Sequence, residues 1–354
     1  MITNHEAMKL SNQLVILRAI RDYGPVTRVD LQKITKLGWG TVTTSVNDFL
    51  QKGIISEIGS IQTGVGRRPI SIDLNTSRNY VVGMRIGRTK TRSLLMDVKG
   101  HVIGDVERPV DGPDVEKLIR SFFDVIDQVL EDYSIGTDQL AGIGVAALGA
   151  VDLSTSTITY APNFQILKGL SVKKIIEQRY KLPCFVDHTS NCYVLAEKLF
   201  GVGQGKENFL GILIGSGVSA GIVINGEVYR GFNYASGEMG HITLEKDGEQ
   251  CDCGNRGCLE LFASGASIGK QGREVAARKK RSAILKYAGY EIGHITGREV
   301  YLAAKDGDAD ALKIFQRVGE ALGLGISYLV NLINPELIVL AGEVVNSNAF
   351  FMPS

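Results

Sequence analysis

The spacing of apolar and polar residues predicts three short helices at the start of the chain. Apolar residues recur at helical spacing in three stretches: residues 10–24, 27–37 and 41–53. Thr27, with Asp30 three residues later, marks the start of the second helix. Gly53 is a typical residue for the end of the third helix. The chain therefore begins with a small helical head.

Two β-branched stretches, residues 54–60 and 70–74, follow these helices and flank a tip rich in glycine and arginine. This order predicts a winged helix-turn-helix over residues 1–77, a module whose third helix lies in the major groove of double-stranded DNA. We expect hydroxyl, basic and aromatic side chains to contact DNA, with those at positions 41 to 45 on an exposed face. The candidates are Thr27, Arg28, Trp39, Thr41, Thr43, Thr44, Ser45, Arg67 and Arg68. A small packing domain without a DNA-binding role is the alternative.

From Tyr80 onward, strands become frequent and the pattern repeats. A round of strand, glycine turn, strand and helix begins at Tyr80, and a second round begins near Phe209. Asn225-Gly226 within the second round is typical of a tight hairpin. The repetition predicts an α/β body of two similar lobes, residues 78–200 and 201–354, with a cleft between them.

The composition predicts the cellular compartment and shows an uneven distribution of charge along the chain. The chain has 354 residues, of which 44% are hydrophobic and 22% charged, as in ordinary folded proteins. No apolar run is long enough to cross a membrane and the start lacks a secretory pattern, so we expect a cytoplasmic protein with reduced thiols. Residues 1–78 carry ten Lys and Arg against six Asp and Glu, and the remainder 29 against 32. This asymmetry favours nucleic-acid contact by the head alone.

Three of the five cysteines lie within eight positions. Cys251, Cys253 and Cys258 are interleaved with glycines, which allow the backbone to turn tightly. With His241 they make four nitrogen and sulfur ligands, the usual closed set of a structural zinc site. Such a set leaves no open coordination position for catalysis. Three free thiols are the alternative.

The segment Cys-X-Cys-Gly-X-X-Gly-Cys-Leu-Glu, downstream of Gly-Glu-Met-Gly-His, resembles the signature of the ROK family of repressors and sugar kinases. The resemblance covers nearly the whole chain. It implies a winged helix-turn-helix followed by a two-lobed, actin-like (ribonuclease H-like) sugar kinase fold, as in the family's sugar-operon repressors. It also implies a structural zinc and a sugar site. The expected sugar contacts are Glu238, His241 and Glu260, with Asn163 as a further residue lining the cleft. The alternatives are a carboxylate at a helix start for Glu260 and a turn residue for Asn163.

Two motifs argue against kinase activity. In the family's first phosphate loop the metal-binding Asp corresponds to Arg85, and a glycine corresponds to Arg88. The general base corresponds to Thr189, whose hydroxyl does not accept a proton at neutral pH, and a sugar-binding Asn corresponds to His188. We therefore expect a regulator that senses sugar and is not an enzyme. The alternatives are an ATP-dependent sugar kinase with a fused head, and a ligand-independent DNA-binding protein.

The resemblance also supplies partners. It implies an operator in double-stranded DNA, a small sugar or sugar phosphate as effector, and a homodimer or homotetramer. The lack of a long apolar run predicts no membrane partner. Bodies of this family normally continue past a strand like the one at residues 335–345. We therefore expect the C-terminal end of the body to be missing from residues 201–354.

Overall fold

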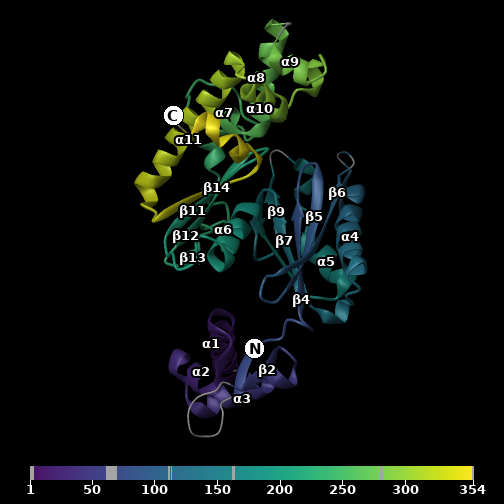
Figure 1. Cartoon of the computed structure of the whole chain (residues 1–354), viewed down its shortest axis with the longest axis vertical. Helices are drawn as coiled ribbons and strands as arrows, with labels where there is room; N and C mark the ends of the chain where they lie inside the picture. Colours follow the sequence, from purple (N-terminus) through teal and green to yellow (C-terminus); the bar gives the residue numbers. More distant parts are fainter. Residues whose placement is uncertain are drawn as a thin grey trace. The chain divides into compact units, whose positions relative to one another are not determined.

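The computed structural model describes residues 4–60, 70–110, 112, 114–161, 164–279 and 282–352 (Figure 1). The chain forms two compact units. The first contains residues 1–145 and 173–185, and the second contains residues 146–172 and 186–354.

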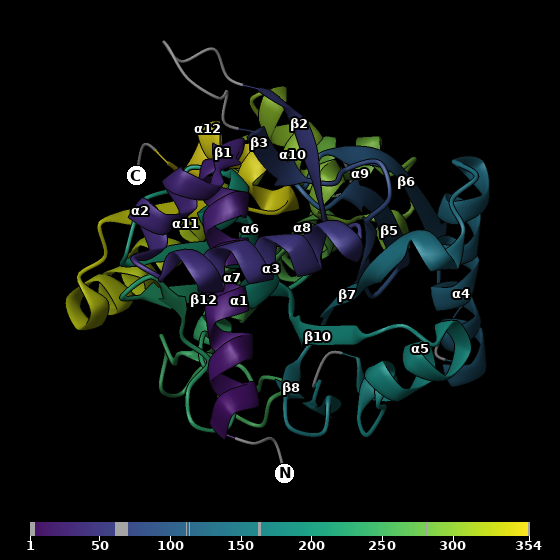
Figure 2. The same cartoon turned by 90° about the horizontal axis from the view of Figure 1, so that it is seen from below.

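The head is a winged helix-turn-helix, as predicted. Its elements are α1 (Asn4–Tyr23), β1 (Val26–Thr27), α2 (Arg28–Thr35), α3 (Trp39–Gln51), β2 (Ile55–Ser60) and β3 (Ile70–Leu74). The three strands form a sheet in the order β1-β3-β2, and α3 runs across α1 (Figure 2). Apolar residues of the helices and the sheet make one core, including Ile16, Leu31, Val46, Phe49 and Ile72. The amphipathic spacing read from the sequence places these residues inside.

Local signals set the helix ends in the head. Thr27 Oγ1 accepts a hydrogen bond from the Asp30 backbone N–H at 3.2 Å, and Asp30 Oδ2 accepts from the Thr27 N–H at 3.0 Å. This reciprocal pair is the capping box predicted for α2. Gly53, just after α3, has a φ of 68°, a conformation that favours glycine and stops the helix.

The first part of the body is an antiparallel meander extended at one edge. Its elements are β4 (Tyr80–Ile86), β5 (Lys90–Asp97), β6 (Val102–Pro109), α4 (Val115–Asp132), β7 (Leu140–Ala147), β8 (Ala150–Asp152), β9 (Thr157–Tyr160), α5 (Val172–Tyr180) and β10 (Cys184–His188). The larger sheet has the order β10-β7-β4-β5-β6, and β8 pairs with β9. The apolar face of α4, with Leu118, Phe122 and Val125 fully buried, covers β5 and β6 (Figure 1).

The second part repeats this plan. Its elements are α6 (Thr189–Phe200), β11 (Phe209–Ile214), β12 (Val218–Ile224), β13 (Glu227–Val228), α7 (Glu260–Ala263), α8 (Gly265–Arg278), α9 (Ala283–Tyr287), α10 (Gly297–Lys305), α11 (Ala309–Ile333), β14 (Leu337–Ala341) and α12 (Asn348–Phe351). The sheet order is β13-β12-β11-β14, with β14 parallel to β11 and the other pairs antiparallel. Asn225 and Gly226, both with positive φ, form the predicted hairpin turn between β12 and β13.

The alternation of side chains along β11 explains how helices cover both faces of this sheet. Leu210, Ile212 and Ile214 point into a core shared with α8, α10 and α11. Phe209, on the other face, packs against Val194 of α6. The helix α6, which the sequence analysis assigned to the first lobe, is therefore part of the second sheet's layers.

The two sheets share one topology. In each, three consecutive antiparallel strands are followed by a fourth strand that pairs beside the first: β7 beside β4, and β14 beside β11. This repetition confirms the prediction of an α/β body with two similar lobes. Among the helices of the described residues, none combines the length and apolar composition needed to cross a membrane.

Candidate functional site

The structure brings the four predicted metal ligands together. The ligand atoms of His241, Cys251, Cys253 and Cys258 all lie within 4.8 Å of one another. Cys253 Sγ is 3.7 Å from Cys258 Sγ, and Cys251 Sγ is 3.7 Å from His241 Nδ1. A tetrahedral zinc with ordinary bond lengths requires sulfur–sulfur and sulfur–nitrogen separations of about 3.8 and 3.6 Å. The residues present therefore fit a tetrahedral metal ion.

Glycine makes this convergence possible. Gly257, next to Cys258, has a φ of 58°, and a Cβ atom there would lie 1.8 Å from the backbone oxygen of Glu245. The Gly257 backbone oxygen accepts a hydrogen bond from the Leu244 N–H at 2.8 Å, and Cys251 N–H donates to the Asn255 oxygen at 2.8 Å. The backbone thus holds the ligands in place by its own hydrogen bonds.

The thiols need a cation to become ligands. Burial raises the pKa of Cys251 and of Cys258 above the ordinary thiol value. Without a nearby positive charge both thiols stay protonated. A bound divalent cation stabilises the thiolate directly, so its binding removes these protons. The chemistry of the donor set therefore matches a soft divalent ion.

The two candidate sugar carboxylates lie beside this centre. His241 directs Nδ1 toward Cys251 and Nε2 toward Glu238, whose Oε2 is 3.9 Å away. Glu260 Oε2 accepts a hydrogen bond from the Val218 N–H at 3.0 Å. Burial, with a contribution from the charge of Glu260, raises the pKa of Glu238 to about 7. One ring nitrogen of His241 therefore faces the cysteines and the other faces Glu238.

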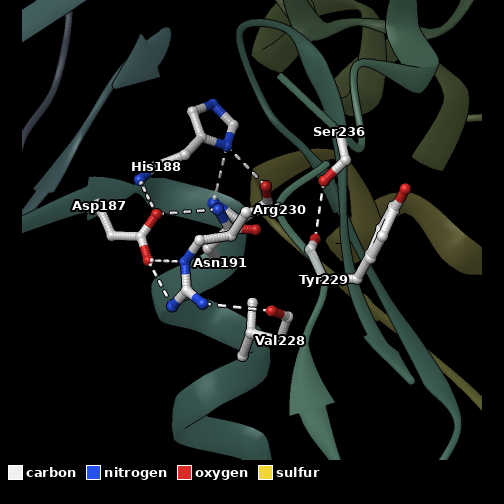
Figure 3. Close-up of polar contacts among 8 residues, drawn as sticks. Asp187, His188, Asn191, Val228, Tyr229, Arg230 and Ser236 are labelled. Carbon is white, nitrogen blue, oxygen red and sulfur yellow. Dashed lines mark hydrogen bonds and ion pairs between the residues drawn. The ribbon is translucent and has the colours of Figure 1, made fainter. Parts of the chain in front are cut away.

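The segment from Asp187 to Asn191, which the sequence analysis aligned with the family's catalytic motif, is held by hydrogen bonds (Figure 3). Asp187 Oδ2 accepts from Arg230 Nε at 2.8 Å, and Asp187 Oδ1 accepts from Asn191 Nδ2 at 2.8 Å and from the His188 N–H at 2.7 Å. Both carboxylate oxygens of Asp187 therefore already accept hydrogen bonds within the protein. Nothing in the sequence signalled Arg230, because a single arginine in a loop has no recognisable spacing to its partner.

His188 is a buried, neutral imidazole. Its Nδ1 lies 2.6 Å from Ser190 Oγ and 3.4 Å from the Ser190 backbone N, so Nδ1 caps the start of α6 as an acceptor. Burial lowers the pKa of His188 to about 4. Because Nδ1 accepts, the ring carries its proton on Nε2.

The structure also describes Thr189 and Arg85, which the resemblance aligned with the general base and the metal-binding acid. Thr189 Oγ1 donates to the backbone oxygen of Ala147 at 2.9 Å. Arg85 is exposed at the end of β4, opposite Arg92 in the register of β4 and β5. A hydroxyl that donates to a backbone oxygen and a guanidinium offer neither a general base nor a metal-binding carboxylate.

In the head, several of the predicted DNA contacts are exposed or half-buried. Trp39 is 49% exposed at the start of α3, Thr44 is exposed and Thr41 is half-buried. Arg28 is half-buried, and its guanidinium donates to Asn47 Oδ1 at 3.2 Å.

Three predicted positions differ from expectation. Ser45 is only 6% exposed because it faces the head core, so its placement on the exposed face of α3 was wrong. Thr43 is half-buried, and within the described part of the chain its Oγ1 is buried without a hydrogen-bond partner. Thr27 is buried and its hydroxyl serves the capping box. Arg67, Arg68 and Asn163 lie outside the described residues.

The chain is similar to known regulators along its whole length. It is 31% identical over 357 residues to the N-acetylglucosamine repressor of Escherichia coli O157:H7, which covers 100% of this chain and 85% of that protein. It is 29% identical over 353 residues to the xylose repressor of Bacillus subtilis strain 168, with 100% of this chain and 87% of that protein covered.

Two solved structures, one of a regulator and one of a kinase, are also similar to this chain. A ROK family transcriptional regulator, described as a homologue of the E. coli MLC protein, matches 98% of this chain and 86% of its own with a TM-score of 0.83 and 29% identity. A ROK family glucokinase from Streptomyces griseus, in complex with glucose and AMPPNP, matches 77% of this chain and 86% of its own with a TM-score of 0.70 and 26% identity. Residues 81–354 match the model of the ROK family. On this evidence, the chain belongs to the ROK family.

Proposed function

We propose that this protein is a transcriptional repressor of sugar-utilisation genes that binds an operator through its head and senses a sugar through its body. The observation that carries this proposal is the combination of a winged helix-turn-helix head with a ROK body, in one chain similar over its full length to two sugar-operon repressors. Such a protein acts in the cytoplasm, where the chromosome lies.

The head would read double-stranded DNA with α3 in the major groove. Thr41, Thr44 and Trp39 are accessible for this purpose, and Arg28 at the start of α2 is suited to a phosphate. Arg67 and Arg68 remain candidates for the wing. A palindromic operator would require two heads, so we propose a homodimer or homotetramer.

The body would bind a small sugar or sugar phosphate. Glu238 and Glu260 offer carboxylate oxygens to sugar hydroxyls, and His241 offers Nε2. Asn163 remains a further candidate. Binding would favour one arrangement of the lobes and so change the spacing of the paired heads, because a ligand shifts an equilibrium only by its different affinity for the two states.

A structural zinc would organise this pocket. His241, Cys251, Cys253 and Cys258 would hold it, and the bound ion would fix the ring plane of His241. A closed set of four ligands gives the metal a structural role and no site for substrate.

Phosphoryl transfer is not part of the proposal. Thr189 and Arg85 stand at the positions that resemblance gives to the general base and the metal-binding acid. Asp187, the nearest carboxylate in the sequence, is occupied by Arg230, Asn191 and the His188 N–H. These contacts support a body that senses sugar without catalysing its phosphorylation.

The rival function is an ATP-dependent sugar kinase with a fused head, favoured by the similarity to the S. griseus glucokinase. A coupled assay for ADP release, with common hexoses and pentoses as substrates, separates the two. The repressor proposal predicts no turnover above the rate without sugar, and steady ADP release with any sugar would overturn it.

Selection of bound DNA from a random pool tests the head directly. The full-length protein should enrich a palindromic sequence with two half-sites. Thr44→Ala should change the enriched bases, whereas Thr137→Ala, a substitution outside the head, should enrich the same sequence. Enrichment of no sequence by the wild-type protein would contradict operator binding.

A further inference from the structure

The loop between β13 and Glu238 is closed on itself. Ser236 Oγ donates to the Tyr229 backbone oxygen at 2.7 Å, and the Ser236 N–H donates to the Arg230 backbone oxygen at 3.2 Å. Gly231, Tyr234 and Gly237 supply the three positive φ angles of this loop. The loop from Tyr229 to Ser236 is therefore compact, because contacts join its two ends (Figure 3).

One end of this loop fixes the backbone of Glu238. Gly237 accepts a hydrogen bond from the Ala220 N–H at 2.7 Å, and a Cβ at Gly237 would lie 1.8 Å from the Ala220 oxygen. The loop base is thus pressed against β12, and Glu238 follows directly. Any displacement of the loop base displaces the proposed sugar-binding carboxylate.

The other attachment is made by a side chain. Arg230 reaches the segment before α6, where its Nε and Nη2 both lie 2.8 Å from Asp187 Oδ2 (Figure 3). Its Nη1 donates to the Val228 oxygen at 3.2 Å, which fixes the guanidinium against β13. The two side chains are 29% and 19% exposed, so the pair is partly shielded from water.

This pair connects the two segments that would form the sugar pocket. One segment carries Glu238. The other runs from Asp187 to Asn191 and carries His188, which resemblance places at a sugar-binding position. We propose that Arg230 is a positioning residue: it binds Asp187 and thereby holds Glu238 in place relative to the start of α6, which prepares the pocket for the sugar. This inference rests on the proposed sugar-sensing function.

The physical reason is preorganisation. A pocket whose two walls are already joined loses less conformational freedom when the ligand binds, so it binds more tightly with the same contacts. If the Arg230–Asp187 pair is broken, Glu238 is still present, but its loop must become ordered when the sugar binds. The free energy needed for this ordering weakens the affinity for the sugar.

Four variants test this role in the full-length, zinc-loaded protein. Arg230→Met removes the charge and keeps the bulk. Asp187→Asn keeps an oxygen for Asn191 and for the His188 N–H, but it presents Arg230 with a neutral partner. The double variant measures coupling, and Arg230→Lys retains the charge. Arg179→Met is the matched control, because Arg179 pairs with Asp127 at 2.6 Å in the first unit.

Isothermal titration calorimetry gives the affinity for D-glucose, D-xylose, N-acetyl-D-glucosamine and N-acetyl-D-glucosamine 6-phosphate. We expect Arg230→Met and Asp187→Asn each to weaken the affinity at least tenfold, or about 1.4 kcal/mol. The double variant should be no weaker than either single one, Arg230→Lys should be intermediate, and Arg179→Met should match the wild type. Melting temperature and zinc content, measured on the same samples, distinguish positioning from a general loss of structure.

The outcomes separate the two proposals. Wild-type binding of a sugar with unchanged affinity in both single variants would overturn the positioning role alone. Additive losses in the double variant would also overturn it. If the wild type binds none of the four probes, sugar sensing itself is contradicted and the positioning role falls with it. If Arg230→Met does not fold, Asp187→Asn carries the same test.

Discussion

The buried imidazole of His188 makes the stability of the second unit depend on pH. Burial lowers its pKa to about 4, compared with an ordinary value of about 6.5. The folded state therefore binds fewer protons than the unfolded state between pH 4 and 6.5. It follows that stability decreases as the pH falls through this window and is fully retained above it.

The size of the effect follows from the shift. A difference of about 2.5 pKa units corresponds to about 3.4 kcal/mol when the pH is below both values. Between pH 7.5 and pH 5, the same linkage predicts a loss of about 2 kcal/mol from this one group. The perturbation that isolates it is His188→Asn, because the Asn side-chain oxygen still caps α6 at the Ser190 N–H but does not titrate.

The assay is urea unfolding of both proteins at pH 7.5 and pH 5. It should be followed by far-ultraviolet circular dichroism, because the only tryptophan, Trp39, lies in the head and does not report on α6. The wild type should lose about 2 kcal/mol more than His188→Asn between the two pH values. Any constant cost of the smaller side chain cancels in this comparison. Equal pH dependence in both proteins would refute the argument.

Four further substitutions have defined outcomes. Gly257→Ala forces a Cβ into the Glu245 backbone oxygen at a positive φ, so we expect a loss of at least about 2 kcal/mol in unfolding free energy together with weaker zinc retention. Cys258→Ser should reduce zinc, measured by plasma mass spectrometry, from one equivalent to well below half, and retention of a full equivalent would contradict the ligand assignment. Thr27→Ala should cost the head about 1 kcal/mol, measured by Trp39 fluorescence, without changing the selected operator, whereas Thr44→Ala should leave stability unchanged and weaken operator binding.

The predicted features with local causes match the structure. Thr27 and Asp30 form a capping box because both partners lie within one turn, and Asn225-Gly226 forms a hairpin because its backbone needs positive φ at both positions. The metal ligands follow the same logic. The three cysteines, Cys251, Cys253 and Cys258, lie within eight positions. The short, glycine-containing chain between them therefore keeps their thiols close together.

Features that depend on tertiary packing were missed or misplaced. Ser45 was expected on the exposed face of α3, but the packing of this helix buries it. The helix α6 was assigned to the first lobe by its position in the chain, whereas its packing against Phe209 makes it part of the second sheet's layers. The Arg230–Asp187 pair spans 43 residues, and no spacing rule identifies such a pair.

The central claim is that sugar binding by the body controls operator binding by the head. The direct measurement is fluorescence anisotropy of the full-length, zinc-loaded protein on its selected operator, with D-xylose, D-glucose, N-acetyl-D-glucosamine and their phosphorylated forms added in turn. We predict that at least one of these compounds changes the operator affinity tenfold or more, and that Glu238→Gln reduces this response while binding of the sugar-free protein to DNA is retained. Operator affinity that stays constant with every sugar would contradict the account.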